Sequence, residues 1–139
     1  MEGMKIIDHL KTLESKDVII NCIADFAASM AFVILQSCKN RYVLSSSILM
    51  QHQMSLTVGG PFENLKNYLK MTNDIDEYLT TLQANKIGLK TDDFKNKVYN
   101  DWWISGISAV DLNLADQYCD ITCSAELYKI EEKIKIESF

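Results

Sequence analysis

The feature that most constrains the fold is an apolar segment that leads into a cluster of small residues. Val18 to Ile23 is a largely apolar run with several β-branched side chains, which is typical of a strand covered on both faces. Residues 27–31 are small apart from Met30, and residues 32–35 are again apolar. The pattern predicts a strand, a tight turn at 27–31 and a buried helix beyond the turn.

The rest of the chain alternates between helical and strand patterns, which favours an α/β layered domain. Apolar residues recur every three or four positions from Phe62 to Leu82, which predicts a long amphipathic helix that ends before Gly88. The other predicted elements are a helix over 4–13, two short strands over 42–44 and 48–50 separated by the serines 45–47, a helix from an N-cap at Thr91 to Tyr99, a helix capped by Ser105 and closed by Asn113 in a left-handed conformation, and a strand over 118–122.

Length and charge limit the domain count and the class of partner. The 139 residues are enough for one domain, which we expect to span 1–125, followed by a charged and helical tail over 126–139. With 14 basic and 19 acidic side chains the net charge is −5, which argues against nucleic acid as the main partner. The sequence predicts no membrane-spanning segment and no signal peptide, so we expect a cytoplasmic protein with no membrane partner.

The four cysteines carry no recognisable pairing or metal-binding pattern. None of them forms a CxxC pair, and no histidine cluster accompanies them. A structural zinc site or a disulfide framework is therefore not expected, and reduced, buried or inert thiols are predicted at all four positions. These positions are Cys22, Cys38, Cys119 and Cys123.

Three residues are candidates for chemistry, and each also has a purely structural explanation. Ser29 lies in the predicted strand-to-helix turn, where a nucleophile can be presented, although small residues also occur wherever a helix packs closely on a sheet. His52 follows an apolar strand and precedes a polar loop, which suits a general base but also a surface histidine. Asp101 directly precedes Trp102 and Trp103, and a carboxylate beside such large apolar groups is expected to be partly desolvated, as an orienting acid requires; the alternative is that the tryptophans are a packing anchor and Asp101 an incidental surface charge.

Three segments, taken together, resemble the Clp-type (ClpP-like) serine peptidases. Residues 23–35 are similar to the nucleophile segment of that family, and residues 47–53 to its histidine segment. Residues 101–105, followed by 109–110 and 114–116, resemble the segment that contains its catalytic aspartate. The order and spacing of the three segments match as well, and residues 57–61 with the long helix fall where the family has its handle. The resemblance extends from about Glu2 to about Asp120.

The resemblance implies a fold, an activity and partners. The fold would be the ClpP/crotonase-like superhelix of repeated β-β-α units with a protruding handle helix. Ser29 would be the nucleophile, His52 the base, Asp101 the orienting acid, and the backbone N–H of Met30 one oxyanion donor, with no cofactor and no metal. Polypeptide substrates, seven-membered rings of identical subunits stacked in pairs, and a ring-shaped ATP-dependent unfoldase are the implied partners.

The sequence departs from the family pattern at several points, so two further functions stay open. Its first residues fall just beyond the family's oxyanion glycine loop, which implies an N-terminally shortened domain. Ala31 replaces a glycine, Met54 a proline, and Asn100 an arginine that helps to join the rings. The alternatives are a non-catalytic structural or regulatory ring subunit, or inactive fragment, and a viral maturation peptidase acting on capsid or scaffold protein.

Overall fold

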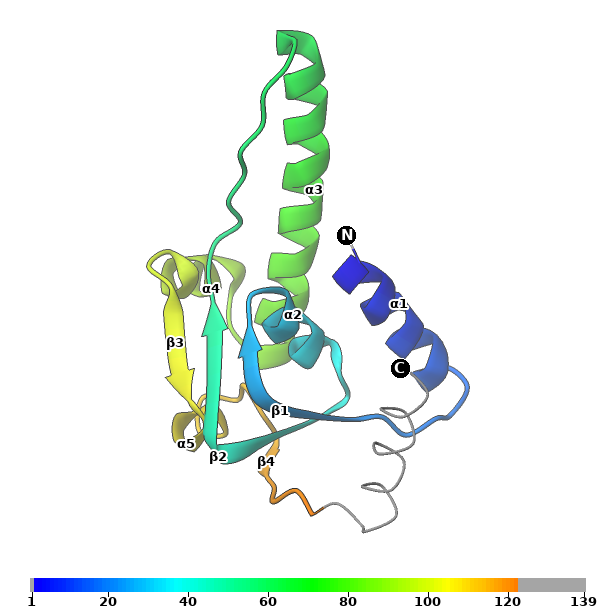
Figure 1. Cartoon of the computed structure of the whole chain (residues 1–139), viewed down its shortest axis with the longest axis vertical. Coiled ribbons are helices and arrows are strands. Elements are labelled where there is room, and N and C mark those ends of the chain that lie inside the picture. The colour runs from blue at the N-terminus through cyan, green and yellow to red at the C-terminus, as the bar shows by residue number, and fades with distance from the viewer. Residues whose placement is uncertain (1, 123–139) are drawn as a thin grey trace, which may run out of the picture.

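The computed structural model describes residues 2–122, in which helices and strands alternate as the sequence predicts (Figure 1). The predicted tail over 126–139 and Cys123 lie outside the described residues. No helix within residues 2–122 combines the length and apolarity that a bilayer span requires. The elements are α1 (Glu2–Glu14), β1 (Asn21–Ala28), α2 (Met30–Ser37), β2 (Asn40–Gln51), α3 (Phe62–Ile87), α4 (Thr91–Val98), β3 (Trp102–Ser105), α5 (Gly106–Ala109) and β4 (Gln117–Tyr118).

A mixed sheet in the order β1-β2-β3 organises the fold, with β4 also paired to β2. β1 and β4 run parallel to β2, whereas β3 runs antiparallel to it. Parallel neighbours need a crossover connection, and α2 supplies it between β1 and β2. The α/β class is therefore confirmed, whereas the repeated β-β-α superhelix stays a prediction.

Residues 42–44 and 48–50 are strand as predicted, but the predicted break at the serines is wrong, because β2 is continuous from Asn40 to Gln51. Ala24 of β1 pairs with Val43, but Phe26 already pairs with Ile48, so the extra residues of β2 form a bulge. The buried hydroxyl of Ser47 accepts a hydrogen bond from the N–H of Leu44 (2.8 Å) and donates one to the carbonyl of Ala24 (2.6 Å). These bonds replace ladder bonds that the bulge interrupts, so the serines continue the strand.

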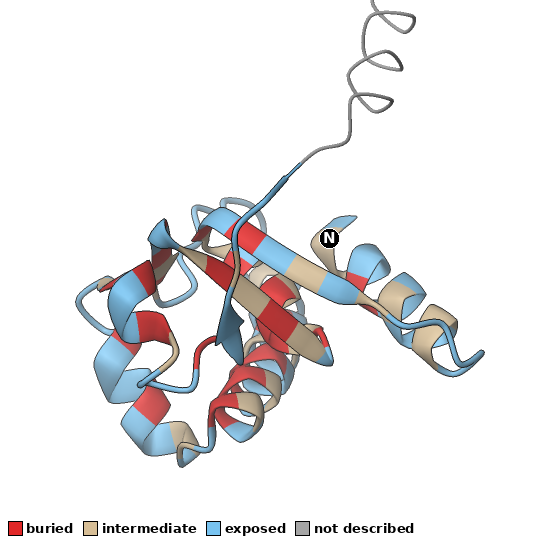
Figure 2. Ribbon diagram, turned by 90° about the horizontal axis from the view of Figure 1, so that it is seen from below, coloured by how far each residue is buried: buried red, intermediate tan, exposed pale blue. Residues whose placement is uncertain are grey.

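The first strand also differs from its prediction in extent and in burial. It begins at Asn21 rather than at Val18 and continues to Ala28. Ala24 and Ala27 are buried against α2, whereas Ile23 and Phe26 are 50% and 60% exposed. Figure 2 shows exposed positions between the buried ones along the strands. β1 is an edge strand, and within residues 2–122 only one of its faces is covered, so a strand buried on both faces was the wrong expectation.

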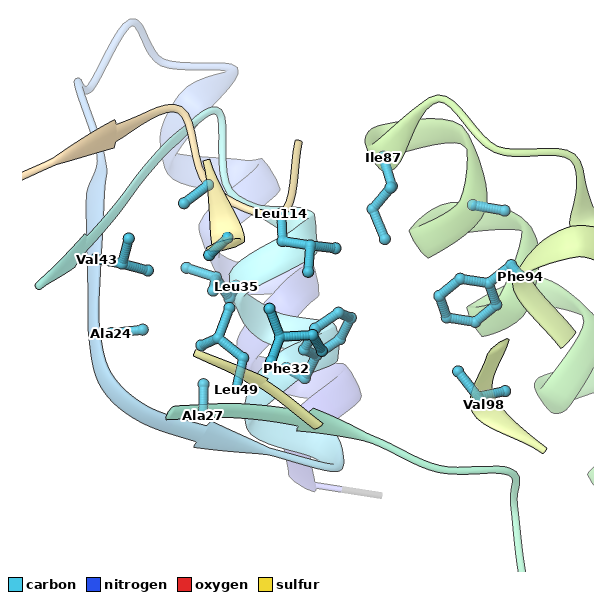
Figure 3. Packing of buried hydrophobic residues seen from close by; sticks show 14 residues of the cluster. Ala24, Ala27, Phe32, Leu35, Val43, Leu49, Ile87, Phe94, Val98 and Leu114 are labelled. Atoms are coloured by element: carbon cyan, nitrogen blue, oxygen red, sulfur yellow. The ribbon is translucent and has the colours of Figure 1, made fainter. Parts of the chain in front are cut away.

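Two packed clusters hold the helices in place. The larger one lies between the sheet and α2, α3 and α4, and the fully buried Phe32 of α2 is one of its largest members (Figure 3). The smaller one joins Ile7 of α1, Val33 of α2 and Leu79 of α3. All buried residues of α3 lie from Thr72 onwards, and the N-terminal half of this helix projects beyond the sheet (Figure 1). Only the C-terminal half of α3 is therefore fixed to the domain.

The helix ends are close to their predicted positions. α3 ends before Gly88 as predicted, and this glycine has φ of 84°; Asn113 has φ of 57°, so its predicted left-handed conformation is confirmed. Ser105 is the N-cap of α5, which is shorter than expected. Thr91 is the first residue of α4 rather than its N-cap, and β4 covers only Gln117–Tyr118.

Two of the four cysteines are bonded, contrary to the prediction of reduced thiols. A disulfide joins Cys22, near the start of β1, to Cys38, at the end of α2. The parallel register places Cys22 opposite Arg41, which brings the end of α2 next to the start of β1. This proximity arises from the crossover and has no signature in the cysteine spacing. Cys119 is a free and partly buried thiol.

Arg41, the one arginine of the chain, is fully buried at the start of β2. Its guanidinium donates hydrogen bonds to the carboxylate of Asp116 (2.7 Å), the side-chain oxygen of Gln36 (2.6 Å), and the backbone and side-chain oxygens of Asn113 (2.9 and 3.0 Å). Burial would raise the pKa of Asp116, but the hydrogen bonds and the positive charge of Arg41 outweigh it and hold the pKa below its usual value. Burial, together with the positive charge of Arg41, lowers the pKa of Lys86.

We expect Gly106→Ala to destabilise the fold, because an added Cβ would overlap the carbonyl oxygen of Leu44 in the bulge. Overpacking of this kind costs about 1–3 kcal/mol. Gly59→Ala is the matched control, since its added Cβ meets no atom within 4 Å. Urea unfolding followed by tryptophan fluorescence should give a lower midpoint for Gly106→Ala alone. Equal midpoints for the two variants would contradict the packing of α5 against β2.

Candidate active site

Ser29 occupies the corner between β1 and α2 in a conformation that few residues other than glycine adopt. Its φ is 55° and its ψ −118°. Its N–H donates to the carbonyl of Met50 in β2 (2.9 Å), so the corner is held against the end of the neighbouring strand. Strained backbone of this kind is concentrated at functional sites. The predicted strand-to-helix turn at 27–31 is confirmed.

The hydroxyl of Ser29 does not cap α2, although Ser29 is the N-cap residue. A serine at this position usually bonds to a backbone N–H of the first helical turn. Here the Oγ of Ser29 lies 2.9 Å from Nε2 of His52, the first residue after β2. Two candidates that are well separated in the sequence are therefore brought into hydrogen-bond contact.

The second ring nitrogen of His52 faces a backbone oxygen. Nδ1 lies 2.6 Å from the carbonyl of Gln53. Because a carbonyl only accepts, Nδ1 carries the hydrogen in the neutral ring, and Nε2 is left as an acceptor for the hydroxyl of Ser29. Gln53 is itself held by α4 and the turn after it, because its N–H donates to Val98 (3.1 Å) and its side-chain amide to Tyr99 (3.2 Å). This tautomer can accept the serine proton.

Asp101 lies beside His52 but is not bonded to it. Gln51 is paired with Trp102 in the β2–β3 ladder, so His52 and Asp101 are the next residues beyond the same end of that ladder. Within residues 2–122 the ring of His52 bonds to Ser29 and Gln53, and none of its hydrogen bonds reaches Asp101. Asp101 is exposed and has φ of 43°, so the predicted partial desolvation is wrong.

The two tryptophans after Asp101 have different environments. Trp102 is partly buried, and its ring packs against Phe32 and Phe94 with centroid distances of 6.5 and 6.4 Å. Trp103 is 58% exposed. Of the two predicted packing anchors, only Trp102 is confirmed. Successive side chains of a strand face opposite sides of the sheet, so Trp102 faces the helices and Trp103 faces away from them.

A cavity of about 500 Å³ opens next to Ser29 and His52. Its apolar wall comes from α2, α3 and α4 and includes Val33, Leu79 and Val98. Its polar groups include the buried amides of Gln51 and Gln83 and the charged side chains of Asp76 and Lys95. A mostly apolar cavity with a few polar groups is the usual form of a ligand site. The hydroxyl and imidazole therefore face a space that can receive a substrate side chain.

The remaining predicted group is the backbone N–H of Met30. Met30 is the first residue of α2, where backbone N–H groups have no partner within the helix and the helix dipole is positive. This N–H lies next to the Ser29 corner, as expected of an oxyanion donor.

Among the described residues, no group of three or more His, Cys, Asp and Glu side chains could hold a metal ion.

Comparison with known families assigns the chain to one of them. The family model for Clp proteases matches residues 1–121 of the chain. The chain belongs to the Clp protease family. The matched range covers every described helix and strand, so the Ser29 corner, His52 and the long helix α3 all lie within the Clp protease domain.

The sequence patterns missed the polar residues that surround His52 in this Clp protease chain. Gln53 orients the ring through its carbonyl, which no side-chain pattern can reveal. Gln51 and Gln83 are buried next to the cavity. Gln83 lies four residues after Leu79, on the apolar face of α3, and a glutamine in that register was an available signal of a buried polar contact.

Proposed function

We propose that this chain is a serine peptidase subunit that cleaves unfolded polypeptides through an acyl-enzyme. The observation that carries the proposal is the 2.9 Å contact between Oγ of Ser29 and Nε2 of His52 at the edge of the cavity. A nucleophile in contact with a base whose other nitrogen is already oriented is the general arrangement for acyl transfer. Membership of the Clp protease family supports the same reaction class.

In the proposed reaction, Oγ of Ser29 attacks the carbonyl carbon of a peptide bond while its proton moves to Nε2 of His52. The oxyanion that forms accepts a hydrogen bond from the N–H of Met30, at the positive end of α2. His52 then gives the proton to the leaving nitrogen as the C–N bond breaks. Water, deprotonated by the same ring, hydrolyses the ester and regenerates Ser29.

Asp101 is assigned the role of a second partner for Nδ1 of His52. Its place beside His52 beyond the end of the β2–β3 ladder supports this role. Contact requires Asp101 and His52 to move relative to each other, and Nδ1 to exchange the carbonyl of Gln53 for the carboxylate. A charged partner would stabilise the imidazolium that forms during the reaction better than a carbonyl can.

Assembly and partners follow from the family and complete the proposal. We infer that the subunit acts in rings of identical subunits, in the cytoplasm, and receives unfolded chains from a ring-shaped ATP-dependent unfoldase. The exposed Asp101 favours a second candidate, a non-catalytic ring subunit in which the acid never engages His52.

A chromogenic ester tests the acyl-enzyme directly. We expect p-nitrophenyl acetate to give a rapid burst of nitrophenol, equivalent to the number of subunits, followed by slower turnover. Ser29→Ala should abolish the burst, whereas Ser15→Ala, which changes an exposed serine outside the cavity, should leave it intact. A burst that survives Ser29→Ala would refute the proposed nucleophile, and its absence from the wild-type chain would favour the non-catalytic subunit.

A further inference from the structure

The amides of Gln51 and Gln83 are buried beside the cavity, where polar groups are costly unless they are hydrogen-bonded. Their residues are 5% and 3% exposed. Gln51 is the last residue of β2, and Gln83 lies on the packed half of α3. A buried amide without partners destabilises a fold, so the bonds of this pair need to be followed in full.

Three hydrogen bonds join the pair to two backbone groups. The N–H of His52 donates to Oε1 of Gln51 (3.1 Å), Nε2 of Gln51 donates to Oε1 of Gln83, and Nε2 of Gln83 donates to the carbonyl of Leu79 (2.9 Å). This series of hydrogen bonds begins at a backbone N–H, which can only donate, and ends at a backbone carbonyl, which can only accept. Only one orientation of each amide satisfies all three bonds, so the arrangement is uniquely defined.

We propose that this amide relay positions the general base, with Gln51 and Gln83 acting as positioning residues for His52. The inference rests on the proposed function of Ser29 and His52. His52 lies just beyond the end of β2. The relay links the backbone N–H of His52 through the two amides to α3, at the carbonyl of the buried Leu79. His52 is held a second time by the hydrogen bond between Nδ1 of its ring and the carbonyl of Gln53.

The relay matters because proton transfer depends steeply on distance. The Oγ–Nε2 contact joins two residues that each directly follow a strand, Ser29 after β1 and His52 after β2. A displacement of about 1 Å at a reacting group can cost about 100-fold in rate. Loss of the relay is therefore expected to slow the reaction of Ser29 by about 10- to 100-fold.

Methionine variants separate this positioning role from a merely structural one. Gln51→Met leaves Oε1 of Gln83 without its donor, and Gln83→Met leaves Nε2 of Gln51 without its acceptor. The double variant removes both amides, so the partly buried N–H of His52 loses its partner and the carbonyl of Leu79 loses its side-chain donor, but no unpaired amide remains. Replacing both partners of a buried hydrogen bond is less damaging than replacing one. The double variant should therefore melt at a higher temperature than either single variant.

The experiment compares three readouts for the full chain and its variants: the rate at which a fluorophosphonate labels Ser29, the melting temperature, and hydrogen exchange at the backbone amide of His52. We expect labelling to stay slow in the double variant although its melting temperature recovers. His52 exchange should accelerate in Gln51→Met and in the double variant. Thr72→Val is the matched control, since Thr72 also bonds to the carbonyl four residues before it in α3 but does not reach His52.

Two results would overturn the inference. One is that Ser29 of the double variant is labelled at the wild-type rate, and the other is that its labelling rate recovers together with the melting temperature. Failure of the proposed function is distinguishable from both. If Ser29 is not labelled in the wild-type chain while His52 exchange still depends on Gln51, the relay stands and the peptidase assignment falls.

Discussion

Ser29→Ala is expected to lower kcat/KM for peptide cleavage by roughly 10⁴- to 10⁶-fold, because the variant retains the cavity but has no atom to form the acyl ester. His52→Ala should cause a loss of similar size, since Oγ of Ser29 then has no base within reach. The double variant should be no worse than either single one, because the two residues act as a unit. Initial rates with a fluorogenic peptide measure all three.

Asp101→Asn belongs in the same series and should have a smaller effect. The carbonyl of Gln53 already holds Nδ1 of His52, so the correct tautomer persists without the carboxylate. Ser15→Ala, which changes an exposed serine outside the cavity, is the control and should retain full activity. Equal activities of Asp101→Asn and Ser15→Ala would mean that the acid has no role, and activity in His52→Ala would contradict the Ser29–His52 mechanism.

Arg41→Met is expected to cause the largest loss of stability, about 3 kcal/mol in the free energy of unfolding. The substitution leaves the buried side-chain oxygen of Gln36 and the backbone oxygen of Asn113 without their donor. Lys39→Met removes a neighbouring but exposed positive charge and should be nearly neutral. Urea unfolding compares the two variants, and a midpoint for Arg41→Met equal to that of Lys39→Met would show that the network contributes nothing.

The contribution of the Arg41–Asp116 pair to the stability of the fold depends on pH in a defined direction. Arg41 lowers the pKa of Asp116 in the folded state below its ordinary value of 3.8. The pair therefore stabilises the fold at pH values above about 3.8, and this contribution is lost as the pH falls through the lower folded-state value. The stability of Arg41→Met should consequently fall less steeply below pH 4 than that of the wild-type chain.

Local patterns predicted the helices and the strand-to-helix corner at Ser29 because both depend on neighbouring residues. The apolar repeat before Gly88 is set by helical geometry, and the small residues around Ser29 are needed wherever a strand turns sharply into a helix. The contact between Ser29 and His52 was expected from the resemblance to Clp peptidases. It is formed because β1 and β2 are adjacent and parallel, so their carboxyl ends meet at one edge of the sheet.

The features that the sequence did not predict depend on contacts between distant residues or on backbone atoms. The disulfide between Cys22 and Cys38 requires the crossover through α2 to bring the two thiols together. Ser47 continues β2 only because its hydroxyl reaches a carbonyl of β1. The exposure of Asp101 is likewise a property of the turn before β3, where φ is positive, and not of the adjacent tryptophans.

Labelling with a fluorophosphonate, followed by mass spectrometry of the adduct, tests the central claim most directly. The contact between Ser29 and His52 predicts one adduct per chain, located on Ser29, with labelling that is lost in both Ser29→Ala and His52→Ala. An adduct on another serine, or labelling of Ser29 that persists at the wild-type rate in His52→Ala, would contradict the account.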